Sequence, residues 1–81
     1  MNWGEAFALR VREILKQKGM TQYKLEQLTG IYHSTMTDIL NCKYKTSNIK
    51  NMAQIIRELG LSMNEFFDSP LFDFDELEID W

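Results

Sequence analysis

Residues 20–43, MTQYKLEQLTGIYHSTMTDILNCK, determine the fold expected for this chain. They are typical of two short helices joined by a tight turn, because Thr21 is a good N-cap and Gly30 can adopt the positive φ of a turn. Apolar residues at helical spacing give each helix one stripe, formed by Leu25 and Leu28 and then by Ile31, Met36, Ile39 and Leu40. Two amphipathic segments about three residues apart form a helix-turn-helix unit.

The second helix of this unit, expected at about residues 32–41, carries more small polar side chains than a buried helix would. Four of them project from its first turns, at the spacing with which a helix lays one face on the floor of a DNA groove: His33, Ser34, Thr37 and Asp38. Phosphate would repel the Asp38 carboxylate, so we expect this group to accept a hydrogen bond from cytosine N4 or adenine N6. The pattern predicts a helix that reads base edges.

Length and composition limit the other classes of protein to which the chain can belong. With 81 residues, 44% of them apolar, it is expected to form one soluble domain whose small core favours dimerisation. The single Cys42 rules out an internal disulfide, and no Cys or His residues have metal-ligand spacing. No apolar run is long enough to cross a membrane. We expect no metal, no cofactor, no signal peptide and a cytoplasmic location.

Charge is distributed unevenly along the chain. Residues 1–67 contain all nine Lys and Arg residues and six acidic residues, which gives a net charge of +3. Residues 68–81 contain six acidic residues and no basic one, which gives −6. We therefore expect a mildly basic domain at 1–67 and an acidic, aromatic tail at 68–81. Such an asymmetry indicates a tail that binds a partner or moderates non-specific binding to nucleic acid.

A first helix is expected before the helix-turn-helix unit, at residues 3–18. It ends at Gly19, and its buried face is formed by Phe7, Val11 and Ile14. Leu9 lies on the opposite side of the helix, and Trp3 has no obvious place in the core. These two residues are either isolated exposed apolar groups or a dimer contact.

Two more helices are expected after a loop at residues 43–48. Asn48 is a good N-cap for a fourth helix at 49–59, whose predicted buried face consists of Ile49, Met52, Ala53 and Ile56. Gly60 ends this helix, and Ser62 and Glu65 form a capping box for a fifth helix through Phe66 and Phe67. Five short helices with short turns predict a compact all-α domain.

The order and spacing of these segments resemble the Cro and phage-repressor type of helix-turn-helix domain, the XRE-like family of bacteria, their phages and mobile elements. The matching segments lie between Leu9 and Phe67 and are RVREILKQKGMTQ, LEQLTGI, STMTDILNCK and IIRELGLSMNEFF. The resemblance implies a lambda-repressor-like five-helix bundle whose third helix enters the DNA major groove, and homodimers that bind two-fold-related half-sites. It also implies that Gln22 binds phosphate. The resemblance further implies that His33, Ser34 and Asp38 read bases, and that Tyr32 and Thr37 make flanking contacts.

Contacts with the sugar-phosphate backbone are expected on both sides of the base-reading helix. Thr21 and Gln22 open a helix whose free amides and positive dipole end can face a phosphate. Three residues follow the base-reading helix and one begins the next, where the chain would meet the DNA backbone: Lys43, Tyr44, Lys45 and Asn48. The alternative for the lysines is a solvated loop.

Glu26 and Tyr32 depart from the pattern of the family. Glu26 stands where Ala is usual, and a carboxylate there needs partners, which the amides at the start of the next helix, Ser34 or His33 can supply. His33 therefore either contacts DNA or pairs with Glu26. Tyr32 replaces the usual Ser or Thr N-cap, so we expect the base-reading helix to be capped from Ser34 and to begin late.

Cys42 also departs from the family pattern, because it replaces the usual Gly after the base-reading helix. The chain still has to turn there, so either Asn41 or Cys42 is expected to adopt the left-handed backbone conformation. Together with the carboxylate of Asp38, these departures predict a DNA-reading surface that is less basic than usual.

The tail, DSPLFDFDELEIDW, begins with Asp68, Ser69 and Pro70, which break the fifth helix. It then alternates apolar and acidic residues with the two-residue period of a strand. Its apolar residues can fold onto the first helix or cross to a second subunit: Phe72, Phe74, Leu77, Ile79 and Trp81. Otherwise the tail is disordered, or is an acidic arm that mimics DNA or docks a partner.

No catalytic motif is present in the sequence, and the triad residue types His33, Ser34 and Asp38 lie on one short helix, where they cannot orient one another. We therefore expect not an enzyme but a sequence-specific DNA-binding transcriptional regulator. It is predicted to be a homodimeric repressor that places two helices in successive major grooves and blocks polymerase. The alternative is a protein-interaction module on the same fold, an antirepressor or adaptor.

Overall fold

The computed structural model describes residues 1–43 and 48–78, and these residues contain five α-helices, one short 3-10 helix and no strand. The elements are α1 at Trp3–Lys18, α2 at Gln22–Thr29, α3 at His33–Leu40, α4 at Ile49–Glu58, α5 at Met63–Phe67 and the 3-10 helix η1 at Pro70–Phe72. The predicted all-α five-helix fold is confirmed. Tyr44, Lys45, Ile79 and Trp81 lie outside the described residues.

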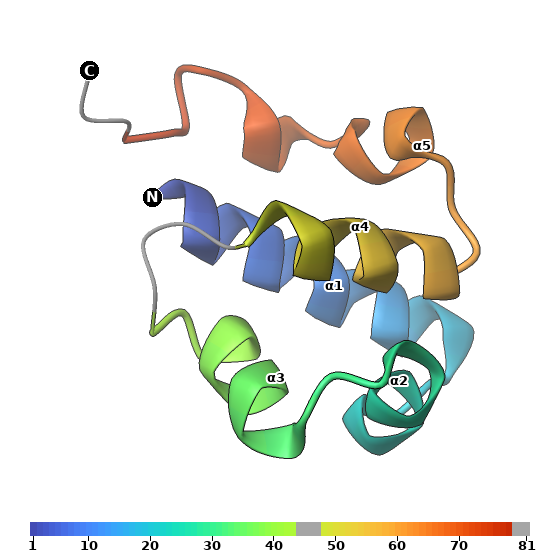
Figure 1. The fold of residues 1–81 in the computed structure, drawn as a ribbon. Coiled ribbons are helices and arrows are strands. Elements are labelled where there is room, and N and C mark those ends of the chain that lie inside the picture. The colour runs from blue at the N-terminus through green and yellow to red at the C-terminus, as the bar shows by residue number, and fades with distance from the viewer. Residues whose placement is uncertain (44–47, 79–81) are drawn as a thin grey trace.

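The helices are arranged around α1 and α4, which lie across the middle of the molecule (Figure 1). The pair α2 and α3 lies on one side of them, and α5 with residues 68–78 of the tail lies on the other. α3 contacts α1, α2 contacts both α3 and α4, and η1 contacts α1. The helix-turn-helix unit is therefore held by the two central helices and is remote from the tail.

The core contains the residues predicted for the first three helices, with one exception. Phe7, Val11 and Leu25 are fully buried, and the stripe of the second helix is also buried: Ile31, Met36, Ile39 and Leu40. Leu28 was expected to form the apolar stripe of α2 with Leu25, and this was wrong, because the Leu28 side chain is 39% exposed. α2 has only two turns and presents one narrow edge to the core, which Leu25 occupies.

The predicted buried face of α4 is partly wrong. Met52 and Ile56 are buried as expected, together with Ile55 and Leu59, but Ala53 is only half-buried. Ile49 is 82% exposed. Helical spacing places Ile49 on the same side as Met52, but it is the first residue of α4, one turn before the core begins.

Trp3 is half-buried against other aromatic rings, so the interpretation of it as an isolated exposed group was wrong, and a dimer contact through Trp3 stays a prediction. Its ring stacks on Phe67 at 5.8 Å and meets Phe72 at 5.4 Å between centroids, while Phe66 packs on Phe7 at 5.3 Å. These rings come from α1, α5 and η1 and form one aromatic cluster. Leu9 is 44% exposed, in agreement with its expected position.

The described part of the tail folds onto the first helix, which was one of its predicted courses. Besides the contact of Phe72 with Trp3, the amide of Glu78 donates to the carbonyl of Met1 at 2.6 Å, and the terminal amine of Met1 donates to the carbonyl of Glu76 at 2.8 Å. The alternating pattern forms η1 and turns here instead of a strand. Phe74 remains 78% exposed.

Most predicted helix ends are confirmed. The Thr21 hydroxyl accepts from the amide of Lys24 at 3.1 Å, Gly30 has a φ of 74°, and Ser62 and Glu65 form the capping box. The prediction that α3 is capped from Ser34 was wrong: α3 begins at His33 without a side-chain cap. Packing of its three buried residues holds α3 in place without the cap.

Cys42 takes the left-handed turn after α3, with a φ of 60°. The amide of Lys43 donates to the carbonyl of Asp38 at 3.0 Å, which is the hydrogen bond of a Schellman motif. A side chain in this conformation costs about 1–2 kcal/mol. Glycine avoids this strain but loses about 0.5–1 kcal/mol more in backbone entropy.

Cys42→Gly is therefore expected to raise the free energy of unfolding by about 0.5–1 kcal/mol in urea denaturation. The control is Asn41→Gly at the preceding position, where φ is −96° and glycine relieves no strain; this change also removes the oxygen that accepts from Arg12. This control should lower the free energy of unfolding. Equal destabilisation by both changes would contradict the assignment of strain to Cys42.

Candidate nucleic-acid interface

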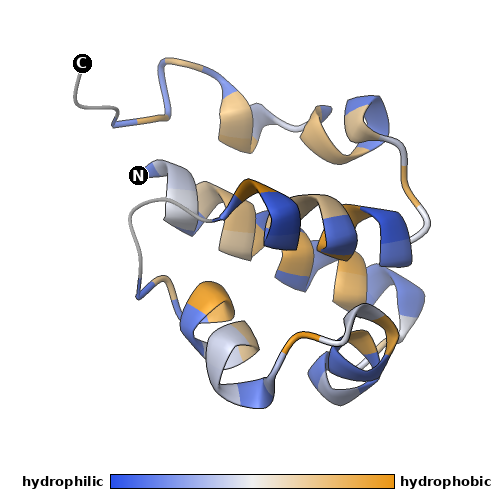
Figure 2. Ribbon diagram, in the orientation of Figure 1, coloured by the Kyte–Doolittle hydropathy of each residue, from blue (hydrophilic) through white to orange (hydrophobic). Residues whose placement is uncertain are grey.

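α3 is anchored on its inner side and polar on its outer side. Met36, Ile39 and Leu40 are buried, while His33 and Ser34 are exposed and Tyr32 is 81% exposed. In Figure 2 the first turns of α3 are pale to blue, and the orange residues gather toward its C-terminal end. The predicted base-reading residues at the start of the helix are thus brought together on one accessible surface.

Arg12 of α1 holds the other end of α3. Its Nε donates to the carbonyl of Leu40 at 3.1 Å, and its Nη2 donates to Oδ1 of Asn41 at 2.9 Å. A cation at this position also suits the negative end of the helix dipole. Reasoning from sequence missed this contact, because a single arginine 28 residues earlier in the chain gives no local signal of it.

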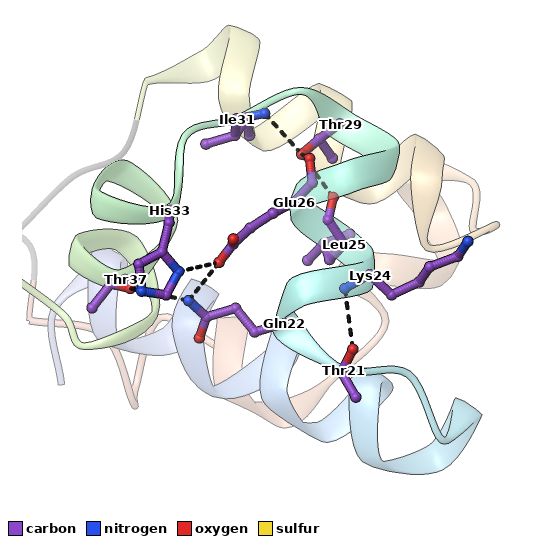
Figure 3. A network of polar contacts seen from close by, with 9 residues as sticks. All are labelled: Thr21, Gln22, Lys24, Leu25, Glu26, Thr29, Ile31, His33 and Thr37. Atoms are coloured by element: carbon purple, nitrogen blue, oxygen red, sulfur yellow. Dashed lines mark hydrogen bonds and ion pairs between the residues drawn. The ribbon is translucent and has the colours of Figure 1, made fainter.

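A network of polar contacts joins α2 to α3 at the start of the exposed surface (Figure 3). Gln22 Nε2 donates to Glu26 Oε2 at 2.9 Å and to Thr37 Oγ1 at 3.0 Å. His33 Nδ1 lies 2.8 Å from the same Glu26 oxygen. The structure thus contains the predicted pairing of His33 with Glu26, and the amide of Gln22 has protein partners.

Glu26 is well suited to the centre of this network, because its side chain is only 10% exposed. Burial by itself raises the pKa of its carboxyl. The hydrogen bonds from Gln22 and His33, with the charge on His33, outweigh burial and lower the pKa of Glu26 below its ordinary value of 4.5. Glu26 is therefore an ionised acceptor in the native protein at neutral pH.

Glu26→Gln is expected to lower the free energy of unfolding at neutral pH. A carboxyl whose pKa is lower in the folded state stabilises the fold above its unfolded pKa, and this stabilisation is lost as the pH falls through the folded pKa. The variant resembles protonated Glu26, so the difference should close below pH 4.5, the ordinary value. Thermal denaturation of both proteins at a series of pH values measures this difference in the free energy of unfolding. A difference that stays constant at all pH values would contradict the lowered pKa of Glu26.

The other predicted contact residues lie around this network. Thr21 is exposed at the start of α2, and Asn48 is exposed at the start of α4, where its side chain accepts from the amide of Asn51 at 3.2 Å. Asp38 and Lys43 form an ion pair at 3.5 Å, so the acidic group and the lysine lie side by side. Tyr44 and Lys45 were predicted as contacts and lie outside the described residues.

A polar groove beside this surface was not predicted. It runs between the start of α3 and the start of α4, and is lined by Tyr32, Thr35, Asn48, Lys50 and Asn51 among others. The helices come together here only in the tertiary structure, so the sequence pattern of either one gives no signal of the groove. Lys50 places a cation on its wall.

Residues 1–43 and 48–78 contain no cluster of three or more His, Cys, Asp or Glu side chains that could hold a metal ion. Among these residues no helix has the length and apolar character needed to cross a membrane.

This fold, with an exposed polar helix carried by a helix-turn-helix unit, defines a DNA-binding domain. The chain belongs to the family of Cro/C1-type helix-turn-helix DNA-binding domains, whose family model matches residues 10–70. Over 67 residues it is 33% identical to the HTH-type transcriptional regulator PuuR of Escherichia coli (strain K12), and equally to PuuR of Shigella flexneri.

These matches cover 83% of this chain but 36% of each relative. The chain therefore spans about a third of the length of the curated relatives that it matches. A search of solved structures gave no significant match.

Proposed function

We propose that this protein is a sequence-specific transcriptional regulator that binds double-stranded DNA as a homodimer and acts as a repressor. Two copies of α3 enter successive major grooves and the bound dimer blocks polymerase. This function belongs to the bacterial cytoplasm, on DNA of the nucleoid, and requires no catalytic step and no cofactor. The relatives are named as transcriptional regulators, which supports the proposal for the part of their length that the chain matches.

The observation that carries the proposal is the two-sided character of α3. Its buried stripe fixes the helix on α1, and its exposed side carries Ser34 and His33 beside the half-buried Thr37 and Asp38. We propose these four as base-reading residues, with backbone contacts from the residues around them: Thr21, Gln22, Tyr32, Lys43, Tyr44, Lys45 and Asn48. The bonds of Gln22 to Glu26 and Thr37 hold its amide between the two helices.

Selection of binding sites from random-sequence duplex DNA tests this function. The purified protein is carried through rounds of enrichment at two salt concentrations. Enrichment of a two-fold-symmetric site is the expected result, because a two-fold dimer presents α3 twice. If no motif is enriched and the residual binding disappears at physiological salt, the proposed function is wrong.

Lys43→Ala is expected to weaken binding to all DNA sequences by a similar factor. Removing one phosphate contact should reduce the slope of log K against log salt by about 0.9. The control is Lys18→Ala: the ammonium of Lys18 lies near Gly60, at the connection between α4 and α5. A change in base preference, with an unchanged salt slope, would contradict a phosphate contact by Lys43.

A protein-interaction function for the tail at 68–81 is a second candidate, and the exposure of Phe74 between the exposed Asp73 and Asp75 favours it. The described part of the tail, residues 68–78, lies on the side of the molecule opposite α3, where a protein partner would not compete with DNA (Figure 1). A protein that ends at Asp68 tests it, in the same selection and in a separate assay of partner binding. Loss of partner binding, with the two-fold site preference retained, would support a separate role for the tail.

A further inference from the structure

The network around Glu26 closes into a ring through a fourth contact. His33 Nε2 lies 3.5 Å from Thr37 Oγ1, which already accepts from Gln22. The ring therefore runs through Glu26, Gln22, Thr37 and His33, with two members on each helix (Figure 3). It has a direction, because the side-chain NH₂ group of Gln22 only donates and an ionised carboxylate only accepts.

The direction of the ring fixes where His33 carries its proton. Glu26 Oε2 can only accept, so Nδ1 must be the protonated nitrogen of a neutral imidazole. Nε2 is then an acceptor, to which the Thr37 hydroxyl can donate. When a second proton binds, Nε2 becomes a donor, Thr37 Oγ1 accepts from it, and the hydroxyl hydrogen of Thr37 must turn elsewhere.

The same imidazole lies at the surface of the predicted DNA contact. The side chain of His33 is 77% exposed, whereas that of Glu26 is 10% exposed and lies behind it. Among the charged groups on neighbouring elements, Asp38 of α3 pairs with Lys43, and Lys50 of α4 lines the groove that passes Tyr32. Lys24 of α2 points away from the imidazole in Figure 3. Glu26 is the carboxylate in direct contact with His33.

We propose that Glu26 fixes the tautomer of His33 and thereby makes His33 a specificity-determining residue whose base preference changes with pH; this inference rests on the proposed function. On DNA, neutral His33 accepts at Nε2 from the exocyclic amine of adenine or cytosine, which takes the place of the Thr37 hydroxyl on the single lone pair of this nitrogen. Protonated His33 donates from Nε2 to guanine O6 or N7. Glu26 does not touch DNA and is a positioning residue.

The tautomer can be tested in the free protein, because His33 is the single histidine of the chain. Long-range nitrogen–proton NMR spectra at about pH 8 are expected to show a protonated Nδ1 and a bare Nε2. Glu26→Ala, which has the small side chain usual in the family pattern, removes the acceptor and should populate the other tautomer as well. Glu26→Gln keeps an amide oxygen that can accept from Nδ1, so it should retain the preference and is the matched control. A protonated Nε2 in the wild-type protein at that pH would overturn the proposal.

The base preference is tested by DNA-site selection at about pH 8 and about pH 5.5. One position in each half-site is expected to change from adenine or cytosine to guanine as the pH falls. Affinity for the guanine site should rise about tenfold between these pH values. His33→Gln, which is neutral at both pH values, is the control and should select the same base at each.

The outcomes separate this inference from the function on which it rests. Identical sites at both pH values, with the expected tautomer, would overturn the inference and leave the DNA-binding function intact. A pH-dependent base that persists in His33→Gln would also overturn it, because another group would then be responsible. If no site is enriched at either pH, both the function and the inference fail.

Discussion

Ser34→Glu is expected to abolish sequence-specific DNA binding and leave the domain folded. Ser34 is exposed in the first turn of α3, on the surface proposed to lie in the major groove. A carboxylate there faces the negative potential of DNA, and such like-charge contacts cost several kcal/mol, so affinity should fall about 100-fold or more. The same charge is favourable for the helix itself, because it lies at the positive end of the helix dipole.

Because Ser34→Glu should weaken DNA binding but not the fold, the two effects can be measured separately. Competition binding to the selected DNA site measures affinity, and urea denaturation should show stability equal to or above that of the wild-type protein. Asn64→Glu is the matched control, since Asn64 is exposed in the first turn of α5, on the far side of the molecule (Figure 1). If both variants lose the same affinity, net charge would explain the loss and the proposed interface would be wrong.

Phe66→Ala is expected to lower the free energy of unfolding by about 3–5 kcal/mol. The ring of Phe66 is fully buried and lies within 6.0 Å, between centroids, of the rings of Phe7, Phe67 and Phe72. Removing it leaves a cavity where α1, α5 and η1 meet. Small domains have a total stability of about 5–15 kcal/mol, so this variant should be partly unfolded at 37 °C.

Circular dichroism during thermal and urea denaturation measures this change. The matched control is Phe74→Ala, the same substitution at a ring that is 78% exposed, and it should change the free energy of unfolding by no more than about 0.5 kcal/mol. Trp3 stacks on Phe67 in the same cluster, so its fluorescence should also change in Phe66→Ala. Equal and small effects of the two substitutions would show that α5 and η1 are not held by this cluster.

The sequence was sufficient to predict those features that depend on interactions between residues close together in the chain. N-caps at Thr21, Asn48 and Ser62 bond to amides three residues later, and the positive φ of Gly30 is demanded by a turn between two adjacent helices. Helical spacing likewise identified Phe7, Val11 and Ile14 in α1 and all the buried residues of α3. These features depend on neighbours within one or two turns, so the pattern of residue types already contains them.

The candidate interface was predictable in outline only. The position of α3 in the chain and its small polar residues indicated which helix is expected to face DNA. Glu26 stands where the family pattern usually has Ala, and this indicated that its carboxylate needs hydrogen-bond partners. The sequence left open whether His33 pairs with Glu26, because that contact depends on the crossing of α2 and α3. The bond from Gln22 to Thr37, 15 residues apart, depends on the same crossing.

The sequence by itself determined the number and order of the α-helices, most of their ends, and which of them carries the polar surface. Only the tertiary structure decided where the buried part of each apolar stripe ends and which segments far apart in the chain pack together. Ile49 has the right spacing for the core but lies beyond its end, and Trp3 has no helical signal yet packs against α5 and η1. Whether a residue is buried depends on which distant segments pack against its face of the helix. The periodicity of apolar residues shows only which face of the helix is apolar.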